Sequence, residues 1–243
     1  MQYLATLYDH EGSSSVPGTP EWDATTAGYM RFGELAASAI RGGEALAPTT
    51  TAITVRPDES GGTLVTDGPF AETAEVFGGY YLLEADSLDD VIELAKEIPC
   101  AAQPNGGVEL RPVVMVWEPE TPVTKGDGDT RYLAAILGPE TKADIPDTPE
   151  WDESAAAHGQ FIEKHPGTLM NGLALHPASA ATTVRVRNGE TLVTDGPFTE
   201  TNEITGGAYV LRAASREEAI AVAQDVPLGP GGAVELRPIV EFT

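Results

Sequence analysis

The chain has 243 residues, 41% of them hydrophobic and 21% charged, which is the composition of a globular protein with one large domain or two small ones. Its 38 acidic and 14 basic side chains leave a formal net charge of −24, and such a polyanion lacks the basic surface that nucleic acids and anionic lipids require. No apolar run reaches the roughly 18 residues of a membrane-spanning helix, so we expect no nucleic-acid and no membrane partner. The single cysteine, Cys100, permits no internal disulfide, which favours a cytoplasmic location.

The first elements in the chain are a strand and a helix. Residues 3–8 form a short apolar run that is typical of a buried strand. A helix is predicted to begin at residues 19–20 (Thr-Pro), because threonine caps helix N-termini and proline fits the first helical position. Apolar residues at intervals of three and four between residues 29 and 39 give this helix one apolar face. We expect the glycine pair at residues 42–43 to end it.

The rest of the first half predicts more strands and a second helix. Runs of β-branched and apolar residues are separated by segments rich in Gly, Pro and Asp, and a serine precedes the second helical pattern as its cap. The expected elements are strands at residues 53–55 and 63–65, a strand at residues 76–83 with a bulge at Gly78 and Gly79, a helix from Ser87 to residue 98, and a final strand at residues 108–117.

The second half of the chain repeats the first. Residues 63–73 (TLVTDGPFAET) return as residues 191–201 with one difference in eleven positions. A period of 126 to 129 residues is a whole domain rather than a solenoid repeat. A segment rich in proline, glycine and charge separates the copies and is typical of a linker. The sequence therefore predicts two domains, residues 1–118 and residues 131–243, joined by a linker at residues 119–130.

The order of predicted elements in each copy indicates an α+β fold. Strand, helix, strands, helix and strand suggest a βαββαβ arrangement, with the helices on one face of a mostly antiparallel sheet. The other sheet face is then apolar and needs a cover, which the second copy can supply. We therefore expect the two copies to pack sheet to sheet as a pseudodimer, with a shared small-molecule cavity between them.

Four motifs resemble the DGPF, or YCII-related, family. They are the opening strands YLATLY and RYLAAI, the segments ITVR and TTVR, the TLVTDGPF turn with a following Glu-Thr, and the closing VELRP. The resemblance implies ferredoxin-like domains of the dimeric α+β barrel type, here fused from what are usually two subunits of a homodimer, so the fused chain is expected as a monomer or a dimer. Most relatives have no known function, and many are encoded beside extracytoplasmic-function sigma factors. Distant relatives include a dehalogenating lyase, and a His/Asp pair is the proposed active site of the family.

Asp67 and Asp195 open the two Asp-Gly-Pro-Phe turns and allow two interpretations. Each carboxylate can act as a general base or a hydrogen-bond acceptor at a pocket rim. Each can also serve the turn alone, since aspartate bonds to backbone two residues on, glycine relieves steric conflict and proline fixes φ. The two roles are compatible.

His158 is the candidate base. At the repeat offset it replaces Tyr29, on the apolar helix face that it shares with Phe161, and the relatives carry their histidine near this position. A carboxylate such as Asp195 or Asp152 would orient it as a base with a pKa near neutrality. The alternative is a core histidine bonded to one backbone carbonyl. Because tyrosine has no base near neutral pH, the second copy is predicted to be catalytic and the first, with Tyr29, to be degenerate or to bind only.

Four arginines occupy matched positions in the two copies. Arg56 and Arg185 end strands, Arg111 and Arg237 lie in the last strands, and all four are candidate anchors for a carboxylate substrate. The alternative for such arginines is a cross-strand ion pair, for example with Glu109 or Glu235. Trp22 and Trp151 are expected to fix the entry of each first helix rather than to line a pocket.

The sequence predicts neither a metal nor a cofactor. It holds no HxH, HExxH or CxxC spacing and no phosphate loop or dinucleotide fingerprint. A solvated loop is the favoured interpretation of the segment around His10, and metal binding through His10 and nearby acids is the alternative. The predicted function is a cofactor-free lyase or hydrolase acting on a small organic molecule, with His158 as base and Asp195 as its orienter. The alternative is a noncatalytic small-molecule-binding or stress-response accessory protein linked to a sigma-factor regulon. A glyoxalase-like metal fold is a third, remote possibility.

Overall fold

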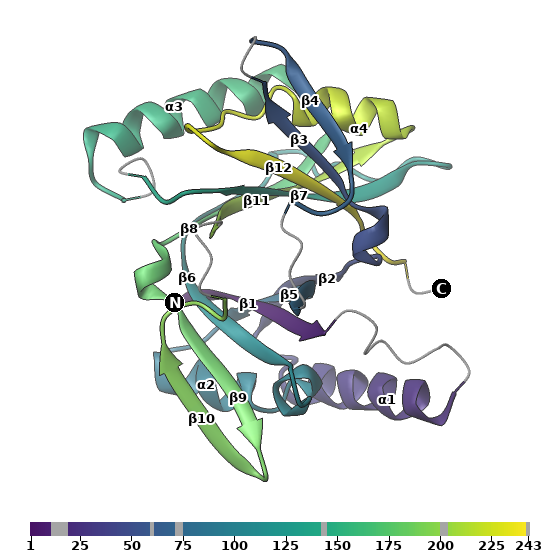
Figure 1. Ribbon diagram of the computed structural model, residues 1–243, viewed down its shortest axis with the longest axis vertical. Coiled ribbons are helices and arrows are strands. Elements are labelled where there is room, and N and C mark those ends of the chain that lie inside the picture. The colour runs from purple at the N-terminus through teal and green to yellow at the C-terminus, as the bar shows by residue number, and fades with distance from the viewer. Residues whose placement is uncertain (11–18, 59–60, 71–74, 142–144, 200–203, 242–243) are drawn as a thin grey trace. The chain divides into compact units, whose positions relative to one another are not determined.

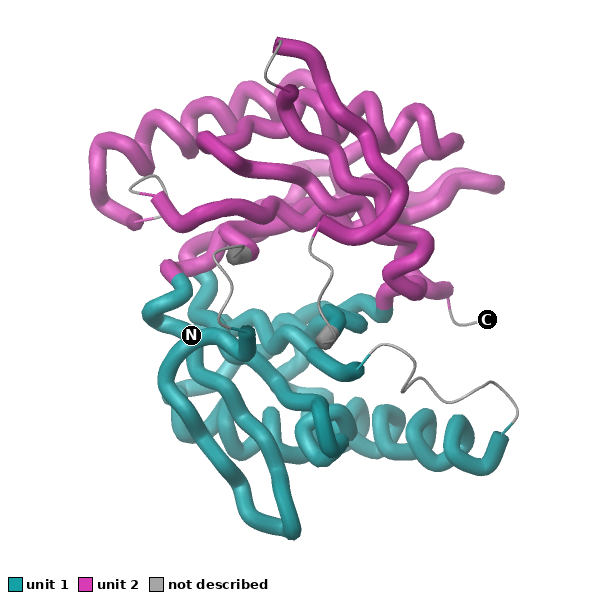
Figure 2. Tube along the Cα trace, in the orientation of Figure 1, with its two compact units in different colours: residues 1–45, 73–113, 178–200 teal, residues 46–72, 114–177, 201–243 magenta. Residues whose placement is uncertain are grey.

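The computed structural model describes residues 1–10, 19–58, 61–70, 75–141, 145–199 and 204–241, and its strands and helices form two compact units (Figures 1 and 2). Unit 1 contains residues 1–45, 73–113 and 178–200, and unit 2 contains residues 46–72, 114–177 and 201–243. The Glu-Thr pairs that follow the two Asp-Gly-Pro-Phe turns lie outside the described residues. The α+β content and the antiparallel ladders agree with the fold class predicted from the sequence.

Unit 1 is an antiparallel sheet with two helices on one face (Figure 1). Its hydrogen-bonded strand order is β2-β5-β1-β6-β9-β10. The elements are β1 (Gln2–His10), α1 (Pro20–Leu35), β2 (Ile40–Ala45), β5 (Glu75–Glu84), α2 (Leu88–Ala95), β6 (Gly107–Trp117), β9 (Thr182–Arg187) and β10 (Glu190–Asp195). Its core joins the apolar faces of α1 and α2 to the sheet, through Phe32, Val91 and Leu83 among others.

Unit 2 has the same architecture, an antiparallel sheet with two helices, built from a second set of strands and helices. Its strand order is β8-β11-β7-β12-β3-β4, and the last residues of β6, 114–117, also belong to this unit, with β6 next to β8 in the sheet order. The elements are β3 (Ile53–Pro57), β4 (Thr63–Asp67), β7 (Thr130–Gly138), α3 (Pro149–Lys164), β8 (Leu169–Leu175), β11 (Ile204–Ala213), α4 (Arg216–Ala223) and β12 (Ala233–Pro238). Phe161, Leu211 and Leu236 lie in its core.

The compact units cut across the sequence repeats, because the two copies exchange a hairpin (Figure 2). The hairpin β3–β4 comes from the first copy, yet β3 pairs with β12 of the second, where Val55 lies opposite Val234. Conversely, β9 of the second copy pairs with β6 of the first, where Val184 lies opposite Val108. Each unit therefore needs residues from both halves of the chain to complete its sheet.

A buried Glu-Arg pair holds each exchanged hairpin in place. In unit 2, Glu235 accepts a hydrogen bond from the backbone N–H of Phe70 (3.0 Å) and pairs with Arg237 (3.1 Å). In unit 1, Glu109 accepts the equivalent bond from Phe198 (2.9 Å) and pairs with Arg111. The predicted partners of these two arginines are confirmed, whereas the predicted cross-strand geometry is wrong, because each pair joins residues two positions apart on one strand.

The helix starts agree with the sequence, whereas the end of the first helix does not. The Thr19 hydroxyl accepts from the backbone N–H of Trp22, and Ser87 caps α2 in the same way. Helix α1 ends at Leu35, and the predicted terminator pair, Gly42 and Gly43, lies inside β2, a strand that the sequence analysis missed. A Cβ at Gly43 would lie 2.8 Å from the backbone oxygen of Tyr80, so glycine serves there to let β2 approach β5.

The predicted bulge at the first glycine pair is present. Leu7 lies opposite Gly79 and Tyr8 opposite Phe77, so Gly78 is the extra residue of β5.

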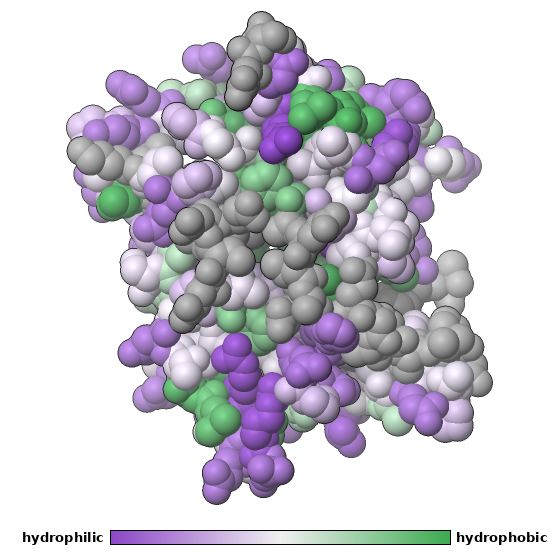
Figure 3. Space-filling view, in the orientation of Figure 1, coloured by the Kyte–Doolittle hydropathy of each residue, from purple (hydrophilic) through white to green (hydrophobic). Residues whose placement is uncertain are grey.

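Hydrophilic side chains are spread over the face seen in Figure 3 and are interrupted by small, separate hydrophobic patches. Within the described part of the chain, no helix is long and apolar enough to cross a membrane.

Candidate functional site

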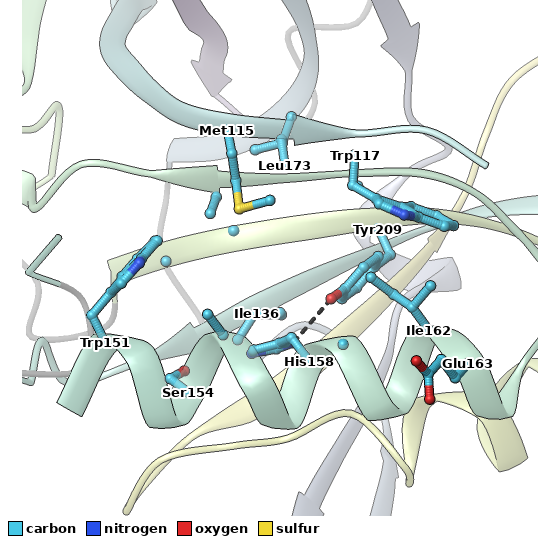
Figure 4. Close-up of a pocket in the computed structure, with 16 residues that line it drawn as sticks. Met115, Trp117, Ile136, Trp151, Ser154, His158, Ile162, Glu163, Leu173 and Tyr209 are labelled. Carbon is cyan, nitrogen blue, oxygen red and sulfur yellow. Dashed lines mark hydrogen bonds between the residues drawn. The ribbon is translucent and has the colours of Figure 1, made fainter. Parts of the chain in front are cut away.

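A pocket of about 470 Å³ lies inside unit 2, between α3 and the sheet (Figure 4). Helix α3 forms one wall, and β7, β8, β11 and the end of β6 contribute to the other. The volume falls in the range of small-molecule sites, and most of the lining side chains are apolar. They include Met115, Trp117, Ile136, Trp151, Ile162 and Leu173.

Two polar side chains meet at the centre of this pocket. Nδ1 of His158, on α3, lies 2.9 Å from the hydroxyl oxygen of Tyr209, on β11. Helical spacing places His158 on the same face as Phe161, which is 3% exposed and anchors α3 to the core. The ring of Tyr209 packs against Phe161 with centroids 5.1 Å apart. The core therefore helps to bring the two polar groups together, and Figure 4 shows the bond between them.

Burial fixes the protonation state of both groups. It lowers the pKa of His158 below its ordinary value of 6.5, because the imidazolium is poorly solvated in the pocket wall. It raises the pKa of Tyr209 to about 12 for the same reason, since the phenolate is the charged form. At neutral pH the pair therefore consists of an imidazole and a phenol that share one hydrogen bond. It presents one donor and one acceptor to the pocket, whichever tautomer the imidazole adopts.

Two glycines, one in the neighbouring strand β8 and one in β11 itself, position Tyr209. A Cβ at Gly172, in β8, would lie 2.6 Å from the ring of Tyr209. Gly206, in the pocket wall, is the extra residue of a bulge in β11, because Thr205 lies opposite Leu137 and Gly207 opposite Ile136. Bulges beside a site commonly redirect side chains, and this one lies three residues before Tyr209.

Replacing Gly172 with alanine should displace the Tyr209 ring and break its bond to His158. We expect a loss of about 1–3 kcal/mol in the free energy of unfolding, the usual cost of overpacking. Urea denaturation would measure this loss, and the matched change Gly159→Ala provides the control. A Cβ at Gly159 meets nothing within 4 Å, so that variant should keep its stability. Equal stabilities for the two variants would contradict this account of how Tyr209 is positioned.

Comparison with known proteins identifies the family. The family model for the YCII-related domain matches twice, over residues 1–118 and residues 131–243. The chain belongs to the YCII-related domain family. It is also similar to "Uncharacterized protein R00369" of Rhizobium meliloti (strain 1021), with 42% identity over 77 residues. The match covers 32% of this chain and 61% of that relative, so it spans about three fifths of the relative's length.

The first YCII-related copy places different residues at the equivalent positions. Tyr29 stands where His158 does, and Tyr81 stands where Tyr209 does. Burial raises the pKa of Tyr29 and of the neighbouring thiol of Cys100, that of Cys100 to about 12. Neither group offers a base at neutral pH. The two copies therefore differ in chemistry at this position, as the replacement of Tyr29 by His158 in the sequence predicts.

The backbone geometry of the two Asp-Gly-Pro-Phe segments agrees with a role of Asp67 and Asp195 in turns. Gly68 and Gly196 adopt φ values of 107° and 102°, a region that favours glycine. Asp67 is exposed and forms an ion pair with Arg216 of unit 2. Asp195 ends β10 in unit 1 and is also exposed. The partner that the structure gives His158 is Tyr209, which the sequence analysis did not consider. The pairing of His158 with Asp195, which belongs to the other unit, stays a prediction.

The remaining candidates lie elsewhere in the structure. Arg56 is exposed on β3, and the guanidinium of Arg185 stacks over the Phe198 ring at 4.3 Å. Neither arginine lines the pocket of unit 2. His10 ends β1 instead of lying in a loop. His165, next to the end of α3, bonds to Asp225 at 2.9 Å. Within the described ranges, no group of three or more His, Cys, Asp or Glu side chains is placed to hold a metal ion.

The aromatic wall of the pocket is what sequence reasoning missed. Trp151 lines the pocket, whereas the sequence analysis expected it only to fix the helix entry. Trp117 and Met115 come from the end of a strand whose first half belongs to the other unit, so no local pattern connects them with α3. Tyr209 did carry a signal, because it follows the repeated glycine pair by two residues in the same way that Tyr81 does.

Proposed function

We propose that this chain is a cofactor-free lyase or hydrolase that takes a small organic molecule into the pocket of unit 2, with His158 accepting a proton from it. The observation that supports this most is the 2.9 Å contact between His158 and Tyr209 in the wall of an apolar pocket of about 470 Å³. An imidazole that burial keeps neutral is ready to accept a proton at physiological pH. Tyr209 holds the ring in one orientation and keeps its own proton.

A noncatalytic small-molecule-binding protein is the second candidate, and one feature favours it. The partner of His158 is a hydroxyl, whereas a carboxylate partner would stabilise the imidazolium that forms when the ring accepts a proton. In this case His158 and Tyr209 would recognise a polar group of the ligand without reacting with it. A role as an accessory protein in a sigma-factor regulon belongs to this alternative.

We further propose that the two copies form ferredoxin-like modules that associate as an intramolecular pseudodimer, as the family resemblance implies. The order β2-β5-β1-β6 with α1 and α2 on one face supports a ferredoxin-like module in unit 1, and β8-β11-β7-β12 with α3 and α4 supports one in unit 2. The exchanged hairpins also support it, since each module needs a strand pair from the other copy. A cytoplasmic chain that is a monomer or a dimer remains part of this proposal.

Filling the pocket tests the proposed function. Gly159 lies on α3 in the pocket lining, with open space around the position of a Cβ. We expect Gly159→Leu to fold normally and to abolish the consumption of any compound that the unchanged protein removes from a metabolite extract, followed by mass spectrometry. Met30→Leu, on an exposed position of α1, is the matched control and should change nothing. Consumption that survives Gly159→Leu would place the reaction outside this pocket.

A further inference from the structure

The charges of the pocket lining restrict the ligand. Among the described residues that line it, the ionisable groups are His158, Tyr209 and Glu163. Burial keeps the first two uncharged at neutral pH, and Glu163 lies exposed on α3. The lining therefore offers no lysine or arginine to an anion. The four arginines that the sequence suggested as carboxylate anchors, Arg56, Arg111, Arg185 and Arg237, are not part of it.

An anionic ligand would lose its hydration in this pocket without gaining a counter-ion. Transfer of a carboxylate into an apolar site costs several kcal/mol unless a charged partner compensates. The chain as a whole carries a net charge of −24, which opposes the approach of anions still further. An ammonium group would also lose hydration, and the one carboxylate of the lining, on Glu163, is exposed to solvent, which screens its attraction.

The shape of the lining indicates what the ligand body is. Trp151 and Trp117 lie toward opposite ends of the pocket, and the bonded His158–Tyr209 pair lies between them on the α3 side (Figure 4). Indole rings give large, flat apolar contacts, for which a planar ring is the best match. The polar pair offers one donor and one acceptor, which suits a single hydroxyl or carbonyl group.

We infer that the ligand is an uncharged molecule with a flat ring system and one hydroxyl or carbonyl group, which contacts His158 and Tyr209 while the rings lie between Trp151 and Trp117. This inference rests on the proposed function, since it concerns the same pocket. It leaves open whether the ligand reacts. It excludes carboxylates and phosphates as the preferred class.

A matched set of indole compounds tests the class by isothermal titration calorimetry at pH 7.5. The probes are indole-3-ethanol, which is neutral, indole-3-acetate, which is an anion, and tryptamine, which is a cation. We expect indole-3-ethanol to bind at least about tenfold more tightly than either charged probe, because only the charged ones have an uncompensated desolvation cost. Gly159→Leu should abolish the binding of all three.

A charge placed in the lining provides the second variant. Ser154 lines the pocket from α3 and is partly exposed, so lysine fits there without burying its whole side chain. We expect Ser154→Lys to raise the affinity for indole-3-acetate, relative to indole-3-ethanol, by about three- to tenfold. The same change at Met30 on α1 should leave the ratio unchanged.

The outcomes separate this inference from the proposed function. If indole-3-acetate or tryptamine binds the unchanged protein as tightly as indole-3-ethanol and Gly159→Leu abolishes that binding, the pocket stands and the neutral class is wrong. If binding of all three survives Gly159→Leu, the pocket is not the binding site and both proposals fail. If none of the three binds the unchanged protein, the inferred class is wrong, and turnover of metabolites then decides the proposed function separately.

Discussion

Replacing His158 with glutamine should lower the rate of the proposed reaction by about 10²- to 10⁴-fold, the usual contribution of a general base. Glutamine can keep a hydrogen bond to Tyr209, yet it cannot accept a proton at neutral pH. Substrate binding should therefore change far less than turnover. The measurement is the rate of consumption of the substrate by each purified variant, with affinity followed separately by calorimetry.

The pH dependence of the unchanged protein follows from the direction of the pKa shift. Burial lowers the pKa of His158, so the proton-accepting form already dominates at pH 7. We expect kcat/KM to be level above pH 7 and to fall as the pH drops through this pKa, which lies below 6.5. Tyr209→Phe should lower the rate by less than His158→Gln, because it removes one hydrogen bond and leaves the base. A rate that is unaffected by His158→Gln would favour the noncatalytic alternative.

Replacing Glu235 with alanine should destabilise the protein by about 3–5 kcal/mol. The change leaves the Arg237 guanidinium buried without its carboxylate and removes the acceptor of the Phe70 N–H. Since Phe70 follows β4, the exchanged hairpin loses a contact that supports the pairing of β3 with β12. The free energy of unfolding in urea measures this loss. Hydrogen exchange should show reduced protection in β3.

Two matched variants serve as comparisons for Glu235→Ala. Glu109→Ala makes the same change in unit 1, where Glu109 accepts from Phe198 and pairs with Arg111, so a loss of similar size is expected. Glu84→Ala removes an exposed ion pair with Arg41 and should cost less than about 1 kcal/mol. If Glu235→Ala and Glu84→Ala cost the same, the buried pairs do not hold the hairpins.

Local patterns predicted most of the individual elements. The Thr-Pro and Ser caps fixed the helix starts, because capping depends on one or two neighbouring residues. Periodicity placed Phe32 and Phe161 in the cores for the same reason. It failed at β2, where two glycines resembled a helix end. The role of Gly43, close approach to the strand that carries Tyr80 and Tyr81, depends on a contact about forty residues away.

Long-range pairing is what the sequence did not reveal. The hairpin strands were predicted, but nothing near residues 53–67 indicates that β3 pairs with β12 of the other copy. The same limit applies to the candidate site. His158 was found through its helix face and the family resemblance, whereas its partner Tyr209 lies 51 residues away on another element. The sequence suggested a carboxylate, Asp195 or Asp152, as the partner of His158, and the contact that the structure adds is the hydroxyl of Tyr209.

The most direct test of the proposed site, the pocket between α3 and the sheet of unit 2, is a crystal structure of the protein after incubation with a metabolite mixture. We expect ligand density in this pocket, with a polar atom about 2.6–3.2 Å from His158 or the Tyr209 hydroxyl. Ligand density elsewhere, with this pocket closed by its own side chains, would contradict this expectation.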